Sequence, residues 1–321
     1  SEPGSIGQHY GTSDPLCRMG RGSAKVKSSC PDEATLMLDY PAIAALAEVI
    51  RRGSFDAAAA ALRVTPSAIS QRIRTLEDRM GGVLLDRGPP IRPTAQGLRL
   101  AAHLDQVRLL EAGLNMAPDQ PVLRLAVNAD SLATWVMPAL AAAPGLVDLT
   151  IDDQDHALDW LRGGLVVAAI TSDSRPVPGC DSLRLGVLRY RATASPDFAA
   201  RHFADGVTAA TLARAPSLCF NSKDALQSRW VQALTGRRLA LPMHRIPDPQ
   251  AFADAARLGL GWGMNLENLI RDDLARGRLV DLAPDLPLDV PLFWQFNRVT
   301  GPVLAPLTDA IKKAARAALL P

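Results

Sequence analysis

Three helical patterns follow one another between residues 41 and 80, and each ends at a residue that stops a helix or caps the next one. In the third, residues 66–80, Thr65 is a good N-cap, Pro66 fits the first helical position and Gly81 follows the last. Its apolar side chains recur at steps of three and four, which predicts one buried face. They are Ile69, Ile73, Leu76 and Met80. Helices this short can bury their apolar faces only against one another, so they predict a small helical domain.

The face of residues 66–80 that points away from this stripe is polar and basic. Its side chains can hydrogen-bond to base edges or phosphates in the major groove of DNA. They are Ser67, Ser70, Gln71, Arg72 and Arg74. By spacing alone, three helices followed by a hairpin fit a helical module of another function equally well.

The segment VLLDRGPPIRPT, residues 83–94, has a short apolar strand and a Gly-Pro-Pro turn. This is typical of the wing of a winged helix-turn-helix, where Arg87 and Arg92 would meet the DNA backbone or minor groove. Between residues 63 and 99 there are seven Arg against three acids, whereas the whole chain has a formal net charge of only +2. Positive charge is therefore concentrated near the predicted DNA-binding helix.

The run GSFDAAAAALRVTPSAISQRIRTLEDRMGGVLLDRGPPIRPTAQG, residues 53–97, resembles the helix-turn-helix of LysR-type transcriptional regulators along its whole length. The resemblance implies a DNA-binding regulator in which Pro66, Ser67, Gln71 and Arg72 lie at or near the groove and Arg87 touches the DNA. We assign the winged helix-turn-helix to residues 37–93. The candidate DNA-binding residues are Thr65, Pro66, Ser67, Ser70, Gln71, Arg72, Arg74, Arg87 and Arg92.

The chain has 321 residues, which predicts two or three folded units. No apolar run approaches the roughly 18 to 20 residues that a membrane span needs, so we expect a soluble protein. Residues 1–36 are rich in Gly, Ser and Pro without apolar periodicity, so we expect a disordered tail, either an expression remnant or an unusual extension. They also lack the apolar segment of a secretory signal, and Met37 resembles a natural start, which favours a cytoplasmic location.

Residues 94–120 predict a linker helix followed by a polar hinge. Apolar positions alternate at steps of four and three, the spacing of a coiled-coil seam. They are Leu100, Leu104, Val107 and Leu114, with the polar Glu111 among them. An ordinary amphipathic helix packed on its own domain has the same pattern. The resemblance favours the seam, because LysR-type proteins pair through this helix into homodimers, and many form homotetramers; a two-fold protein matches a pseudopalindromic operator.

Residues 121–321 alternate apolar strands with helices, which predicts open α/β sheets. Strands are expected at residues 122–129, 147–151, 166–170, 185–190, 217–220 and 291–296. The pattern resembles the two-lobed, periplasmic-binding-protein-like effector domain of LysR-type regulators. We expect lobe I at 121–190 and 269–321 and lobe II at 191–268, so the chain crosses near Tyr190 and returns near Asn268. A ligand would lie between the lobes.

The segments NADSLATW, IDDQDH, FNSKD and GLGWGM resemble the subgroup of LysR-type regulators named after ArgP and LysG (IciA). This resemblance implies an effector that is lysine or arginine and control of a basic amino-acid exporter gene. A helix starting at Ser131 would offer its N-terminus to the carboxylate, and acids after strands would bind the ammonium groups. The candidate effector residues are Asp130, Ser131, Thr134, Trp135, Asp153, Asn221, Asp224, Trp262 and Met264. Helix capping and solvated loops are the alternative roles for the acids, and core packing is the alternative role for the tryptophans.

Other functions find little support in the sequence. No GxSxG, HExxH, Walker or GxGxxG motif follows a strand, so we expect neither an enzyme nor a cofactor. The four cysteines form no CxxC pair and the five histidines are scattered, which argues against a metal site. His156 near Asp153 is more typical of a surface pair than of a catalytic dyad. The remaining alternatives are a solute-binding protein and a LysR-type regulator with a different effector. For a LysR-type regulator, the expected partners are operator DNA, a small-molecule effector, a second copy of the chain and RNA polymerase.

Overall fold

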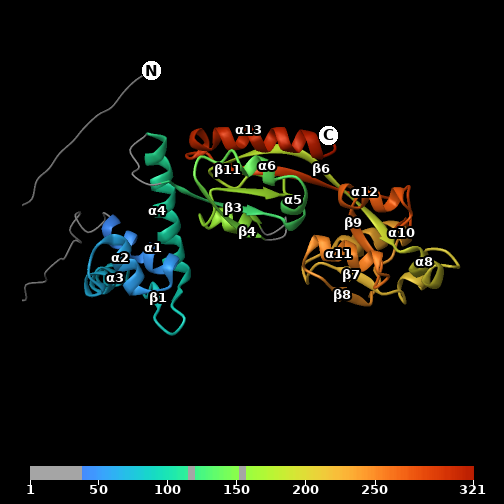
Figure 1. Ribbon diagram of the computed structural model, residues 1–321, viewed down its shortest axis with the longest axis horizontal. Helices are drawn as coiled ribbons and strands as arrows, with labels where there is room; N and C mark the ends of the chain where they lie inside the picture. Colours follow the sequence, from blue (N-terminus) through green and yellow to red (C-terminus); the bar gives the residue numbers. More distant parts are fainter. Residues whose placement is uncertain (1–37, 115–119, 152–156) are drawn as a thin grey trace, which may run out of the picture. The chain divides into compact units, whose positions relative to one another are not determined.

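The computed structural model describes residues 38–114, 120–151 and 157–321. The first elements are α1 Tyr40–Arg52, α2 Phe55–Leu62, α3 Pro66–Met80, β1 Leu85–Asp86 and β2 Arg92–Pro93 (Figure 1). Neighbouring residues set these bounds: Oγ1 of Thr65 accepts a hydrogen bond from the Ala68 amide at 3.2 Å. Gly81 ends α3 with a φ of 67°, in the left-handed region that glycine adopts at little cost. The predicted helix–helix–helix–hairpin order is therefore found.

One apolar core holds α1, α2, α3 and the hairpin together. The stripe predicted on α3 faces into this core, with Met80 at its edge. The largest buried members are Ile43, Leu46, Ile69, Ile73, Leu76 and Leu84. Because all of the apolar stripe points inward, the polar face of α3 remains on the surface.

The linker helix, α4 Ala95–Gly113, departs in part from the predicted seam. Leu100 and Leu104 are buried in the core of their own chain, where α4 packs against α1. Only the later seam positions remain accessible, with Leu114 70% exposed. The amphipathic-helix alternative therefore describes the first half of α4, since a leucine stripe is satisfied equally by an intramolecular neighbour.

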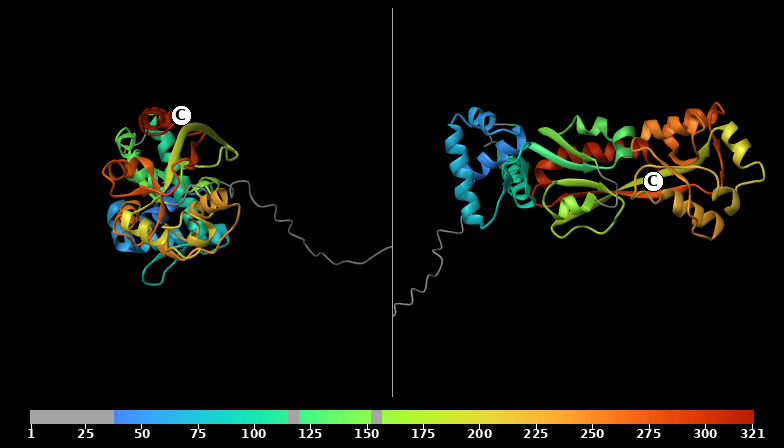
Figure 2. Two further views of the ribbon diagram at one scale, coloured as in Figure 1. Left: turned by 90° about the vertical axis from the view of Figure 1, so that its right-hand side faces the viewer. Right: turned by 90° about the horizontal axis from the view of Figure 1, so that it is seen from below.

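A seven-stranded sheet forms the centre of the C-terminal part, in the order β10-β6-β11-β5-β3-β4, with β9 also paired to β6. Its strands are β3 Val122–Val127, β4 Leu146–Ile151, β5 Ala168–Thr171, β6 Cys180–Ala194, β9 Gly263–Leu266, β10 Val280–Asp281 and β11 Leu288–Asn297. β3 runs parallel to β4 and β5, and the remaining pairs are antiparallel. The helices of the first lobe, which contains β3, β4, β5 and β11, are α5 Ala129–Thr134, α6 Met137–Leu140, α7 Ala157–Arg162 and α13 Gly301–Ala318. α13 packs against α6, β6 and β11 (Figures 1 and 2).

A smaller parallel sheet, β7 Ser217–Cys219 with β8 Met243–Arg245, lies in the second lobe. The helices around it are α8 Pro196–His202, α9 Ala209–Leu212, α10 Leu226–Thr235, α11 Pro249–Arg257 and α12 Glu267–Ala275. Cys180 and Cys219 are buried free thiols. No helix among the described residues is long and apolar enough to cross a lipid bilayer.

The long strand β6 connects the two lobes. Up to Tyr190 it pairs with β11, and from Tyr190 onward it pairs with β9 and then β10. The structure thus places the crossing at Tyr190, but the return comes later than the predicted Asn268. α12 and β10 stay with the second lobe, and the chain re-enters the first lobe only with β11 at Leu288. Pro284 and Pro287, just before β11, mark this return in the sequence.

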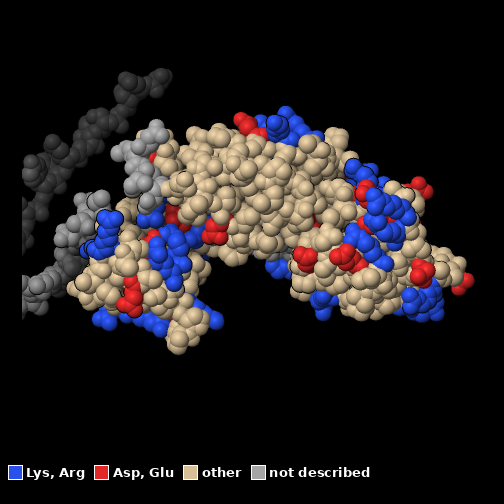
Figure 3. Space-filling view, in the orientation of Figure 1, with Lys and Arg blue, Asp and Glu red and all other residues tan. Residues whose placement is uncertain are grey.

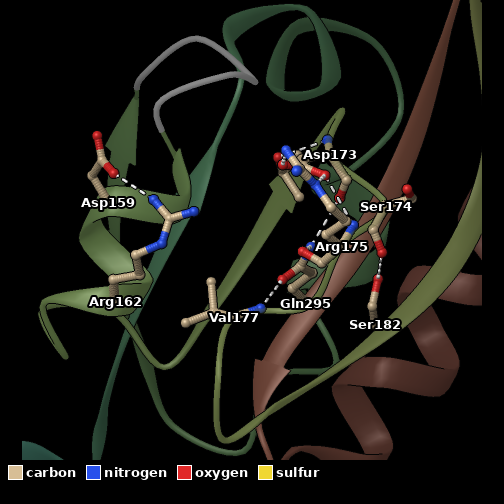
Figure 4. A network of polar contacts seen from close by, with 9 residues as sticks. Asp159, Arg162, Asp173, Ser174, Arg175, Val177, Ser182 and Gln295 are labelled. Atoms are coloured by element: carbon tan, nitrogen blue, oxygen red, sulfur yellow. Dashed lines mark hydrogen bonds and ion pairs between the residues drawn. The ribbon is translucent and has the colours of Figure 1, made fainter.

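Gln295 on β11 is fully buried and holds the loop between β5 and β6 (Figure 4). Its Oε1 accepts a hydrogen bond from the Val177 amide at 3.1 Å. Its Nε2 donates to the backbone carbonyls of Asp173 at 2.8 Å and Arg175 at 3.0 Å. One side chain therefore satisfies three backbone groups and fixes the loop that leads into β6.

Replacing Gln295 by alanine is expected to lower the free energy of unfolding by about 1 to 3 kcal/mol, because the buried Val177 amide and two partly buried carbonyls lose their partner. All five tryptophans lie beyond residue 134, so urea denaturation followed by tryptophan fluorescence reports on the C-terminal part. Ser182→Ala is the matched control, since its hydroxyl makes only a 3.4 Å contact with the carbonyl of Ser174. Equal midpoints for Gln295→Ala and the control would show that the loop does not depend on Gln295.

Candidate functional site

The outer face of α3 is the first candidate surface. Five of the predicted DNA-binding residues here are exposed: Thr65, Pro66, Ser67, Gln71 and Arg74. Two are half-buried: Ser70 and Arg72. Figure 3 shows Lys and Arg side chains gathered along the edge of the molecule that carries α3 and β1. A helix with amide, hydroxyl and guanidinium groups on one exposed face has the chemistry needed to hydrogen-bond to base edges.

Arg87 in the wing already has partners within the chain. Its guanidinium donates to Glu77 at 2.9 Å and lies over the ring of Phe55, with 5.8 Å between the guanidinium carbon and the ring centroid. Glu77 also accepts a hydrogen bond from the Leu84 amide at 2.9 Å. Arg87 therefore fixes the hairpin against α2 and α3, and its contact with DNA stays a prediction. Arg92 on β2 is exposed.

Asp105 on α4 links the N-terminal helices to the C-terminal sheet. One carboxylate oxygen lies 3.5 Å from Arg51 at the end of α1, and the other lies 3.1 Å from Arg124 on β3. Burial raises the pKa of Asp105, and the charges of Arg124 and Arg51 act in the opposite direction. This cluster therefore joins α1, α4 and β3 through one buried carboxylate.

A cavity of about 820 Å³, measured with its open mouth, lies where α5, β6, β9, α10 and α11 meet. It contains residues from both lobes: Asp130 follows β3 in the first, and Asp224 precedes α10 in the second. Four of the predicted effector residues line it: Asp130, Asn221, Asp224 and Met264. A cavity with mixed apolar and charged walls at strand ends is the usual seat of a small ligand in an α/β fold.

Asp130 lies in the first turn of α5, and Oδ2 of its carboxylate accepts a hydrogen bond from the hydroxyl of Tyr190 at 2.5 Å. Burial raises the pKa of Asp130 to about 6. The hydrogen bond from Tyr190 lowers the pKa, and the negative charge of Asp224 raises it further. The Asp130 carboxyl group is thus half protonated near pH 6 and mostly ionised at neutral pH.

Asp224 and Asn221 also shape the loop that carries them. The carboxylate of Asp224 accepts hydrogen bonds from the amides of Phe220 and Leu226, both at 2.9 Å. Oδ1 of Asn221 accepts from the amides of Lys223 at 2.8 Å and Asp224 at 3.1 Å. Asp224 therefore holds the backbone before α10 through both carboxylate oxygens, and it is also a lining residue of the cavity.

The structure places four other predicted effector residues outside the cavity lining. Ser131 is fully buried, because α5 begins at Ala129 and not at Ser131. The hydroxyl of Thr134 donates to the backbone carbonyl of Asp130 at 2.6 Å. Trp135 is buried in the core, and Trp262 is fully buried with its ring centroid 5.3 Å from that of Trp230. The core alternative for both tryptophans is thus the observed one. Asp153 and His156 lie outside the described residues.

Several polar residues of the cavity were not predicted from the sequence. They are Asn128, Tyr190, Lys223, Arg229 and Asn265. Tyr190 ends the predicted strand at 185–190, where the chain crosses between the lobes. A tyrosine at this position could have been predicted to line a cavity between them. Arg229 follows Asp224 by five positions, and only the fold shows that its helix faces the cavity.

Comparison with protein families identifies the family of this chain. Residues 41–98 match the bacterial regulatory helix-turn-helix protein, lysR family, and residues 117–316 match the LysR substrate binding domain. The chain belongs to the LysR family. It is therefore a transcriptional regulator with an N-terminal DNA-binding domain and a C-terminal domain for a small-molecule effector, and the predicted family and fold class are confirmed. The periplasmic label in that prediction is only a loose analogy for the two lobes.

Relatives of this LysR-family chain extend over most of its length. It is 45% identical to the HTH-type transcriptional regulator LysG of Mycobacterium tuberculosis over 285 residues, which are 87% of this chain and 94% of the relative. It is 44% identical to ArgP of Pseudomonas aeruginosa over 287 residues, which are 85% and 95% of the two chains.

Solved structures of LysR-family regulators resemble it as well. The crystal structure of ArgP from Mycobacterium tuberculosis matches with a TM-score of 0.75 and 43% identity, covering 88% of this chain and 99% of that one. Full-length LysG from Corynebacterium glutamicum, solved with bound effector Arg, matches with a TM-score of 0.63 and 34% identity, covering 88% and 100%.

Proposed function

We propose that this LysR-family regulator senses L-lysine or L-arginine in the cavity between its lobes and that occupancy changes how it binds DNA. The observation that carries the proposal is a pair of carboxylates, Asp130 and Asp224, in the lining of one cavity. Two carboxylates complement a ligand with two cationic groups. The similarity to ArgP and to a LysG solved with arginine supports the same ligand class. No cofactor is needed for such a function.

On the DNA side, the exposed face of α3 would enter the major groove and the hairpin would meet the backbone. Ser67, Gln71 and Arg74 are the exposed polar residues most suited to reading bases or holding phosphates. A homodimer, or a homotetramer built from it, would match a two-fold operator. We further propose that the protein contacts RNA polymerase at its promoter and that the controlled gene encodes an exporter of basic amino acids.

The protein is also proposed to act in the cytoplasm and to catalyse no reaction. Among the described residues, the cavity lining contains no His, Cys or Ser that would act as a nucleophile or general base. The mixture of acidic, basic and apolar side chains in the lining supports binding of a charged small molecule.

Calorimetry on the full chain tests the proposed ligand class most simply. L-lysine, L-arginine and L-histidine are titrated at pH 7.5, with L-citrulline as a neutral analogue of arginine. Lysine or arginine is expected to bind, and citrulline at least about 30-fold more weakly, because one ion pair worth about 2 kcal/mol or more is lost. Binding of citrulline as tight as that of arginine, or no binding of either basic amino acid, would reject the proposal while leaving the family assignment intact.

A further inference from the structure

The charged groups of the cavity include bases as well as acids. Asp130 and Asp224 are accompanied by Lys223 and Arg229 in the lining. A basic amino acid carries two cationic groups and one carboxylate. Its charge complement is therefore two acids and at least one base, and this lining provides both.

Arg229 is the base whose position is most firmly set. It lies on α10 three residues after Leu226, which also lines the cavity, so one face of α10 forms this wall. The next residue, Trp230, is fully buried, and its indole nitrogen donates to the carbonyl of Leu286 at 2.9 Å. Trp230 thus anchors the turn of α10 that carries Arg229, and the orientation of that wall is fixed.

Arg229 is an exposed residue, and among the described residues its guanidinium, like that of Arg237, lacks the ion pairs that hold some other arginines of its lobe. Arg257 and Arg278 are both paired with Asp273. In the part of the chain that the structure describes, the guanidinium of Arg229 makes no ion pair or hydrogen bond. A planar guanidinium at a cavity is suited to hold a carboxylate through two parallel hydrogen bonds.

From this charge pattern we infer that Arg229 binds the α-carboxylate of the effector and makes the regulator select amino acids over their decarboxylated amines. The inference rests on the proposed function. A diamine such as cadaverine, or agmatine in place of arginine, satisfies both acids but leaves Arg229 facing a ligand without an anion. The regulator then recognises both the cationic groups and the α-carboxylate of the ligand.

The test compares three ligands that differ only at the carboxylate: L-arginine, L-argininamide and agmatine. Dissociation constants are measured by calorimetry for the full-length wild type, Arg229→Gln and Arg229→Lys. Arg237→Gln is the matched control, because Arg237 is an exposed arginine of the same lobe outside the cavity lining. Thermal midpoints show whether each variant is folded.

The wild type is expected to prefer L-arginine over both analogues by tenfold or more. Arg229→Gln should lose tenfold or more for L-arginine and less than about threefold for the analogues, Arg229→Lys should recover part of the loss, and Arg237→Gln should match the wild type. If Arg229→Gln binds L-arginine as the wild type does, or weakens all three ligands equally, the inference is overturned and the carboxylate has another seat. If the wild type binds none of the three, the same comparison is made with L-lysine, L-lysinamide and cadaverine; if it binds none of these either, the proposed function fails first and the inference fails with it.

Discussion

Replacing Gln71 and Arg74 together by alanine is expected to weaken binding to operator DNA by at least about 30-fold. Both side chains are exposed on the outer face of α3, while the opposite face is buried. A good contact with a base edge contributes about 1 to 3 kcal/mol, so two contacts contribute at least about 2 kcal/mol. The measurement is fluorescence anisotropy with an operator fragment obtained by selection in vitro, repeated at several salt concentrations.

Arg79→Ala is the control for this prediction, because Arg79 lies in the last turn of α3, 3.6 Å from Asp39. It should change operator affinity by less than about threefold. Because the double variant removes the positive charge of Arg74 next to the DNA, the slope of log affinity against log salt should also become shallower. Unchanged operator affinity in the double variant would show that α3 is not the DNA-reading helix.

Asp130→Asn is expected to weaken L-arginine binding by at least about 30-fold at pH 8 and to remove its dependence on pH. A cation binds the ionised carboxylate, so in the wild type affinity is highest above the Asp130 pKa of about 6 and falls as the pH drops below it. At pH 5, one unit below this pKa, about one tenth of Asp130 is ionised, and affinity should be about tenfold lower. Calorimetry between pH 5 and 8 measures this directly.

The same substitution should act in the opposite direction on the empty protein. Because the folded-state pKa of Asp130 is raised from 3.8, its contribution to stability is lost as the pH rises through 6. Asp130→Asn removes the buried charge and can still accept the hydrogen bond from Tyr190, so its thermal midpoint at pH 8 should exceed that of the wild type. Asp205→Asn, at an exposed acid of lobe II outside the cavity lining, should change neither property. A pH profile shared by wild type and Asp130→Asn would assign the titration to another group.

The N-terminal helices were predictable because their signals are adjacent in the sequence. Thr65 and Gly81 define α3 through contacts within four residues, and its apolar stripe has only one core to face. The linker was harder to predict, because Leu100 and Leu104 have the same spacing whether they meet a second copy or α1 of their own chain.

The cavity depends on contacts between distant residues, and its prediction was correspondingly incomplete. Asp130 and Asp224 were found because acids just after strands usually project into a cleft. Tyr190 meets Asp130 across 60 positions, and neither residue signals the other. Trp262 was expected at the ligand, but no local pattern distinguishes a tryptophan that lines a cavity from one packed against Trp230.

In the proposed mechanism, a cation bound in the cavity changes how α3 binds DNA. Footprinting of the full-length protein on its operator, with and without L-arginine, tests it for the wild type and for Asp130→Asn. L-arginine is expected to shift the protected region or the affinity for the wild type, at concentrations that match its calorimetric dissociation constant, and to leave Asp130→Asn unchanged. A wild-type footprint that stays the same when calorimetry shows the cavity filled would contradict the account.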